Sequence, residues 1–171
     1  MKTLDRSSLS VLIVENDAGY RATLRIVLRN IGILNVYESK NAVQAFQILR
    51  KHRIDIILSE HQLPGISGHQ LICAIRSKRN LPFWAVPIIF ISQSCEKKHV
   101  IAAIDSGVDA FLVKPVQPSS LAQRLDVILS GERQAFEIWL EKQEIHLPSQ
   151  DVGAALTPSE QHGDTEDVFM I

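Results

Sequence analysis

Short apolar runs alternate along the chain with segments in which apolar residues recur at helical spacing. An apolar run of about four to eight residues is typical of a buried strand, whereas apolar residues three and four positions apart indicate an amphipathic helix. Strands are therefore expected at residues 10–14, 33–37, 54–59, 87–92 and 110–113. Helices are expected between Asp17 and Gly32, at residues 41–52, 68–77 and 96–106, and from Ser119 or Ser120 to Leu129.

Polar residues and glycines mark the ends of these helices. Asp17 is a good N-cap for the first helix, and Gly32 can end it. In the helix at 41–52 we expect Val43, Phe46 and Leu49 to face the core, because their spacing places them on one side of a helix.

Five strands alternating with five helices over about 120 residues predict an open parallel sheet with helices on both faces. In such folds, binding sites lie at the carboxyl ends of the strands. The residues that end or follow the strands are therefore the candidate site residues: Glu15, Asn16, Asp17, Glu60, Ser92 and Lys114.

Four segments of the chain resemble, in order and spacing, the motifs of the bacterial response-regulator receiver domain: VLIVENDAGYRATL, SEHQLPG, PIIFIS and FLVKP. The resemblance covers about residues 10–130. It implies a flavodoxin-like α/β fold, (βα)5, with strand order 2-1-3-4-5, and a role in two-component phosphorelay signalling. It also implies a role for each matching residue. Glu15 and Asn16 take the place of two acids, and Glu60 takes the place of the phosphoacceptor aspartate. Ser92 corresponds to the switch hydroxyl and Phe111 to the aromatic switch. Lys114 matches the family's lysine, and Pro115 matches a proline that is usually preceded by a cis peptide bond.

Two of these residues differ from the family pattern. The family's Mg²⁺ is bound by the second acid, the phosphoacceptor and a backbone carbonyl at the position of Gln62, and Mg²⁺ needs near-octahedral oxygen ligands. Asn16 removes one charge from this set, and Glu60 carries its carboxylate one methylene group farther than aspartate. We therefore expect weak or absent Mg²⁺ binding and no other cofactor. If a metal binds, Asp17, Glu60 and Gln62 are the candidate ligands, although Asp17 is better placed as an N-cap.

Glu60 permits three interpretations. Its longer side chain can reach Lys114 and Ser92, which in the family hold the phosphoryl group while the aromatic switch moves inward, so Glu60 can imitate the phosphorylated state. Alternatively, Glu60, Glu15 and Lys114 form an ion-pair cluster with a structural role only. The third interpretation is that some phosphorylation persists.

Composition limits the remaining possibilities. The chain has 171 residues, is 46% hydrophobic and has two cysteines, which is typical of a soluble cytoplasmic protein without a disulfide framework. No apolar run is long enough for a membrane span, and no secretory signal is recognisable. No DNA-reading motif or dense basic stripe indicates nucleic-acid binding. No nucleophile elbow, phosphate-binding glycine loop or Cys/His metal spacing is present, so an enzyme is not expected.

Charge is unevenly distributed. Of 18 Lys and Arg and 19 Asp and Glu, five acids and no Lys or Arg lie in residues 146–171, so residues 1–145 carry 18 bases against 14 acids.

The expected domain organisation has four parts. We expect a short N-terminal lead segment at residues 1–9, a receiver-like domain at 10–130, an extra helix at 131–146 and an acidic disordered tail at 147–171. The extra helix can pack on the receiver or form a dimer seam. The apolar quartet Val168-Phe169-Met170-Ile171 can be a docking peptide or a frayed end.

These observations together predict a stand-alone, atypical receiver protein that signals through protein–protein interaction without aspartate phosphorylation. Its expected partner surface is the face formed by the fourth helix, fifth strand and fifth helix, around residues 100–104 and Phe111, and a homodimer is possible. Two alternatives stay open: a conventional receiver phosphorylated by a histidine kinase, and a truncated regulator whose effector domain follows residue 171.

Overall fold

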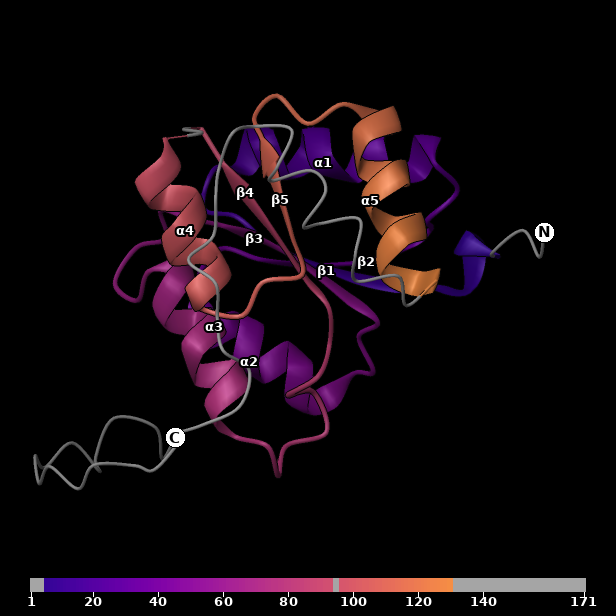
Figure 1. Cartoon of the computed structure of the whole chain (residues 1–171). Helices are drawn as coiled ribbons and strands as arrows, with labels where there is room; N and C mark the ends of the chain where they lie inside the picture. Colours follow the sequence, from indigo (N-terminus) through magenta and orange to yellow (C-terminus); the bar gives the residue numbers. More distant parts are fainter. Residues whose placement is uncertain (1–4, 94–95, 131–171) are drawn as a thin grey trace, which may run out of the picture.

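The computed structural model describes residues 5–93 and 96–130 (Figure 1). The chain begins with the 3-10 helix η1 (Arg6–Ser8) and then alternates strands and helices. The strands are β1 (Ser10–Val14), β2 (Asn35–Ser39), β3 (Ile56–Glu60), β4 (Ile88–Ser92) and β5 (Ala110–Val113). The helices are α1 (Ala18–Asn30), α2 (Ala42–Lys51), α3 (Gly68–Ser77), α4 (Lys97–Asp105) and α5 (Pro118–Ser130).

The five strands form one parallel sheet in the order β2-β1-β3-β4-β5, as predicted. Both faces are covered by helices (Figure 1). Side chains alternate across a strand, so β1 sends Leu12 and Val14 into a core shared with α2, α3 and α4, and Val11 and Ile13 into a core shared with α1 and α5. Because both faces are buried, the central strands β3 and β4 are apolar along almost their whole length.

The boundaries of β1, α3 and β5 are those predicted, but β2 and β3 each begin two residues later than expected. Ile33 and Ile54 are buried although neither lies in a strand. Apolar character predicts burial rather than strand pairing, and in these two loops the buried residue precedes the first paired residue of the strand.

The predicted inner face of α2 was partly wrong. Val43 is 59% exposed, whereas Ala42, Ala45 and Leu49 are buried and Phe46 is partly buried against the core. Asn41 caps the helix by accepting a hydrogen bond from the Gln44 N–H at 2.9 Å. The helix is rotated so that small alanines face the sheet and Val43 faces outward.

The extra helix expected at 131–146 and the acidic tail expected at 147–171 lie outside the described residues. Within residues 5–93 and 96–130, no helix has the length and apolar character to cross a membrane.

Candidate functional site

Glu15, Glu60 and Lys114 meet at the carboxyl edge of the sheet. Val14 and Ser59 are neighbours in the β1–β3 register, so the residues that follow them, Glu15 and Glu60, extend from adjacent strands at the same height. Lys114 follows β5 and reaches them from beyond β4. Its backbone is fixed there because its N–H donates to the Ser92 carbonyl at 2.8 Å.

The ammonium group of Lys114 bridges the two carboxylates. Its Nζ donates to Glu15 Oε2 at 2.6 Å and forms an ion pair with Glu60 Oε2. The side chains of Lys114, Glu15 and Glu60 are only 11%, 4% and 6% exposed, respectively. An ion pair screened from water in this way is stronger than one on an open surface, but it also requires that every charged atom has a partner.

The second oxygen of each carboxylate is bound by the backbone. Glu15 Oε1 accepts from the Asp17 N–H at 2.9 Å, and Glu60 Oε1 accepts from the Gln62 N–H at 3.0 Å. All four carboxylate oxygens therefore have a donor supplied by the chain itself. The cluster is complete as it stands and carries one net negative charge.

Tyr20 closes the cluster on the side of α1. The Lys114 Nζ lies 4.2 Å from the centre of the Tyr20 ring, within the range of a cation–π contact. The Tyr20 hydroxyl accepts from the Val116 N–H at 3.1 Å, which ties α1 to the loop between β5 and α5. No local sequence pattern indicated the contact of Tyr20 with Lys114.

The surroundings shift the pKa values of Lys114 and Tyr20. Burial by itself lowers the pKa of Lys114, but the hydrogen bonds to Glu15 and Glu60 outweigh it, so that the pKa is raised above 10.5. Burial raises the pKa of Tyr20 above its usual value, against the opposing effects of the Val116 N–H and of Lys114. Both groups are therefore protonated at neutral pH, and Lys114 is held as a cation.

Asn16 and Asp17, the next two residues after Glu15, are both exposed. The Asp17 carboxylate caps α1 by accepting from the Tyr20 N–H at 2.5 Å, as predicted. The guanidinium of Arg21 donates to the carbonyl oxygens of Glu15 and Asn16 at 2.7 and 2.8 Å. A second cation therefore fixes the loop between β1 and α1, a contact that sequence reasoning did not identify.

The loop after β3 is held close to the cluster by tight packing. Ser67 and Gln70 form a reciprocal capping box at the start of α3. A Cβ atom at Gly68 would lie 2.1 Å from the Glu60 carbonyl oxygen, so only glycine permits α3 to start this near to Glu60. The backbone around Glu60 is consequently fixed on both sides.

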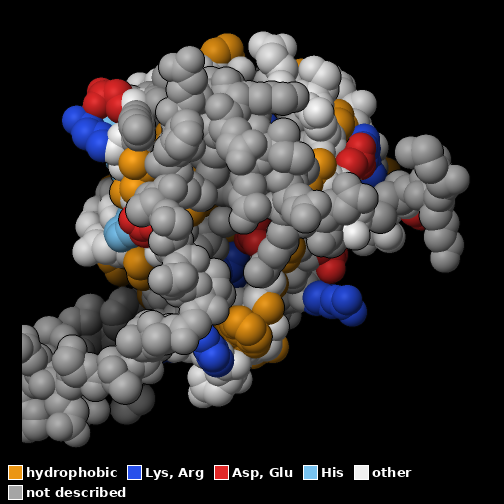
Figure 2. All heavy atoms as spheres, viewed as in Figure 1, with side chains coloured by type: hydrophobic (Ala, Val, Ile, Leu, Met, Phe, Trp, Pro, Cys, Tyr) orange, Lys and Arg blue, Asp and Glu red, His pale blue; other side chains and the backbone are white. Residues whose placement is uncertain are grey.

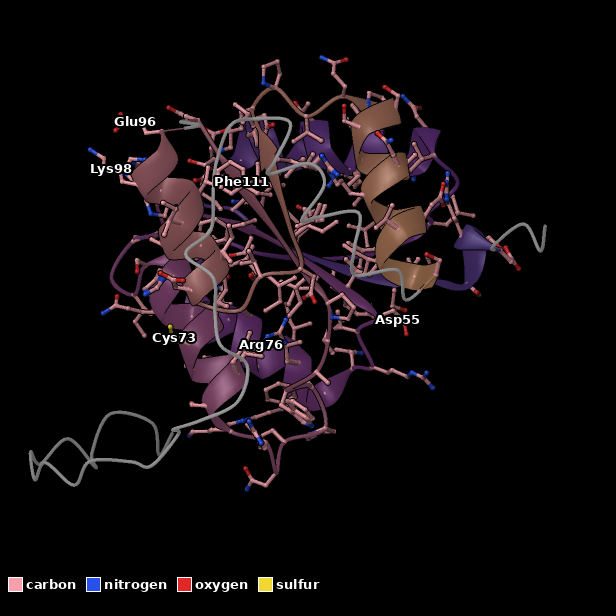
Figure 3. All side chains as sticks on the ribbon, in the orientation of Figure 1. Asp55, Cys73, Arg76, Glu96, Lys98 and Phe111 are labelled. Carbon is pink, nitrogen blue, oxygen red and sulfur yellow. The ribbon has the colours of Figure 1, made fainter. Side chains whose placement is uncertain are left out.

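The resemblance assigns Ser92 and Phe111 as switch positions, and they lie on the neighbouring strands β4 and β5. Ser92 ends β4 and is 4% exposed. Phe111 is fully buried, with its ring centre 6.2 Å from that of Phe90 (Figure 3). The peptide bond between Lys114 and Pro115 is cis, as the resemblance implied.

His61, in the loop after β3, is half-buried. Its ring lies 5.5 Å from that of Phe90 and 5.3 Å from that of His99 on α4. Burial, and then the neighbouring His99, lower the pKa of His61 below 6.5.

The side chains present do not fit a magnesium site. Mg²⁺ needs several oxygen ligands in near-octahedral geometry, but Lys114 bridges the two buried carboxylates, Asn16 is neutral and exposed, and Asp17 caps a helix. Among residues 5–93 and 96–130, no group of three His, Cys, Asp or Glu side chains is arranged to hold a metal ion.

Comparison with known proteins points to a single family. The model of the response regulator receiver domain matches residues 11–126. Chemotaxis protein CheY-3 of Vibrio cholerae is 27% identical over 128 residues, which cover 75% of this chain and 97% of that protein. Chemotaxis protein CheY of Pseudomonas aeruginosa is 24% identical over 120 residues, which cover 70% of this chain and 95% of that protein.

Solved structures show the same fold. A putative response regulator from Chloroflexus aurantiacus superposes with a TM-score of 0.66 at 28% identity, covering 71% of this chain and 98% of the other. The receiver domain of a Pseudomonas aeruginosa sensor histidine kinase, with a magnesium ion coordinated in its active-site cleft, superposes with a TM-score of 0.62 at 25% identity, covering 72% and 98%.

Proposed function

Because this chain belongs to the response regulator receiver domain family, we propose that it is an atypical receiver that transmits signals by binding a partner protein and does not use aspartate phosphorylation. One observation carries the proposal. The side chain at the phosphoacceptor position, Glu60, is bound on both oxygens, by Lys114 and by the Gln62 N–H. An acceptor that is already bound in this way is a poor nucleophile for a phosphoryl donor.

Charge and geometry support the same conclusion. Phosphoryl transfer depends on positioning and on cations that neutralise the transferring group. Here Asn16 leaves the metal ligands one charge short, and the extra methylene of Glu60 displaces its carboxylate from the position of an aspartate. A displacement of order 1 Å can lower a rate about a hundredfold.

We further propose that Glu60 imitates the phosphorylated state. Its carboxylate pairs with Lys114, the group that the resemblance assigns to binding the phosphoryl oxygens. Phe111 is fully buried, which is the position that the aromatic switch takes when that site is filled. The pairing of a permanent anion with Lys114 therefore favours a permanently active form.

The expected partner surface is the face of α4, β5 and α5. Val100 and Phe111, which we used to locate this face, are both fully buried and belong to the core. Exposed residues of the same elements, including Lys98, Ala102 and Val113, are the ones that a partner can contact. The buried side chain of Phe111 supports this surface from beneath.

The proposal is tested by treating the purified chain with acetyl phosphate and Mg²⁺ and measuring its intact mass. We expect no acid-labile phosphoryl adduct. A stoichiometric adduct that disappears in Glu60→Ala contradicts the proposal and favours a conventional receiver phosphorylated by a histidine kinase.

The mimicry is tested separately by amide NMR spectra of Glu60→Gln. Removing the charge should shift amide signals of Phe111 and of the α4–β5–α5 face as well as those near Glu60. Asp55→Asn, which removes a partly buried acid at the opposite edge of the sheet, where it accepts from the Ser10 N–H, is the matched control and should shift only its neighbours. Shifts confined to the ends of β1 and β3 in Glu60→Gln mean that the cluster has a structural role only.

A further inference from the structure

The edge of the sheet opposite the candidate site carries a group of exposed basic side chains, here called the basic surface. It consists of two residues at the end of α2, one in the following loop and two just after α3. These residues are Arg50, Lys51, Arg53, Lys78 and Arg79, and all five are exposed. Two acids lie near these cations. Asp55 accepts from the Ser10 N–H at 2.9 Å and pairs with Arg53 at 3.6 Å, and Asp109 accepts from the Ile88 N–H at 2.8 Å and pairs with Arg76 at 2.8 Å.

An exposed aromatic side chain lies in the same region. Trp84, in the loop between α3 and β4, is 40% exposed. Arg76 holds this loop by donating to the carbonyl oxygens of Trp84 and Val86 at 2.6 and 2.9 Å (Figure 3). The rings of Phe46 on α2 and Phe83 are 6.3 Å apart, so the loop packs against the helix that bears two of the cations. Figure 2 shows Lys and Arg side chains on both sides of hydrophobic side chains at this end of the molecule, in the lower part of the view.

The chain leaves α5 at this edge of the sheet. Arg6 in η1, just before β1, binds Asp126 in the last turns of α5 at 2.6 Å. Ser130, where α5 ends, is therefore near the amino-terminal ends of the strands (Figure 1). A shallow hollow lined by Ser8, Leu9, Ser10, Arg53 and Asp55 lies between η1 and the start of β3.

The sequence that follows is complementary to this surface in charge and in polarity. Residues 146–171 contain Asp151, Glu160, Asp164, Glu166 and Asp167 and no Lys or Arg, and they end with the apolar quartet Val168-Phe169-Met170-Ile171. We propose that residues 151–171 bind to the basic surface of the same chain, with their acids against its cations and their apolar end against Trp84.

The attachment of this segment to α5 makes a weak contact sufficient. About 30 residues separate Ser130 from Glu160. The helix predicted at 131–146 would span about 24 Å, and the roughly 14 residues that follow it would have an average end-to-end distance of about 20 Å as a flexible chain. The effective concentration of a segment tethered by such a linker is of order mM. Exposed ion pairs are individually weak, but several of them together need only a Kd below about 1 mM for the bound form to predominate at that concentration.

The experiment uses the full-length chain with a nitroxide label on Ser159→Cys, in a Cys73→Ser, Cys95→Ser background. At low salt we expect the label to weaken the amide signals of the last turn of α2 and of residues 78–86, and ascorbate to restore them. Raising the salt from about 0.01 M to about 1 M shortens the screening length from about 30 to about 3 Å and should restore them too.

Two charge variants provide the matched comparison. Arg50→Gln with Lys51→Gln should abolish most of the weakening. Lys40→Gln with Lys98→Gln removes the same charge from the opposite end of the molecule, where both side chains are exposed, and should leave the weakening unchanged.

Three results overturn the proposal. The first is that the spin label does not weaken the amide signals of α2 and of residues 78–86. The second is that both charge variants reduce the weakening of these signals equally. The third is weakening that occurs only between molecules, detected by mixing a spin-labelled ¹⁴N chain with an unlabelled ¹⁵N chain, because it assigns the surface to a second copy.

Discussion

Replacing Lys114 by methionine tests the energetic basis of the ion cluster. Methionine keeps much of the aliphatic stem beside Tyr20 but removes the ammonium group, so that Glu15 and Glu60 lose their shared partner. We expect the free energy of unfolding to fall by about 1–3 kcal/mol, mainly because two acids are left uncompensated rather than because an attraction is lost.

The structure sets the magnitude of this effect. Both acceptor oxygens contact the same Nζ, so they are separated by about 5 Å at most. Two like charges at about 5 Å repel by about 3 kcal/mol at an effective dielectric constant of about 20. Each carboxylate keeps its backbone donor, from Asp17 or Gln62, so the loss should not exceed this value.

Urea unfolding followed by circular dichroism measures the effect, with Arg25→Met as a control for loss of an exposed arginine that pairs with Glu38 at the surface. Lys114→Met with Glu60→Gln should recover much of the loss. A loss no larger than the control's, or a double-mutant cycle without coupling, refutes both this reasoning and the mimicry proposed for Glu60.

Four further predictions concern the metal, the pH dependence of stability at alkaline and at acid pH, and packing. Glu60→Asp alone should not restore Mg²⁺ binding, whereas Glu60→Asp with Asn16→Asp should, as measured by calorimetric titration; equal binding by the single and double variants shows that Asn16 is not the limiting residue. Because the folded-state pKa of Lys114 is raised above 10.5, its stabilising contribution should be complete below that pH and disappear as pH rises through the folded value, and Lys114→Met should show a shallower alkaline loss in urea unfolding. Because the folded-state pKa of His61 is lowered below 6.5, stability should decline as pH falls below about 6.5, and His61→Gln should reduce that decline. Gly68→Ala should lower the unfolding midpoint because the added Cβ would overlap the Glu60 carbonyl, whereas Gly65→Ala, which meets no atom within 4 Å but has a positive φ of 77°, should cost only about 1 kcal/mol from backbone strain.

The sequence by itself determined the fold and the location of the candidate site. Five apolar runs separated by helical patterns are enough to predict a parallel sheet, because burial on both faces requires nearly continuous apolar strands. The strand order came from the resemblance carried by the motifs around Glu15, Glu60 and Lys114. These three residues could be placed at one edge because parallel strands all end on the same side of a sheet.

Only the tertiary structure decided which atoms meet there. Tyr20 and Arg21 lie on a helix whose spacing fixes only an inner and an outer face, and their contacts with Lys114 and the β1–α1 loop depend on how α1 packs on the sheet. The same limit explains Val43, since an apolar side chain does not reveal which rotation its helix takes once Asn41 caps it. Local sequence carries the periodicity of each element. The pairing of charges between elements depends on distances that exist only after the elements have packed together.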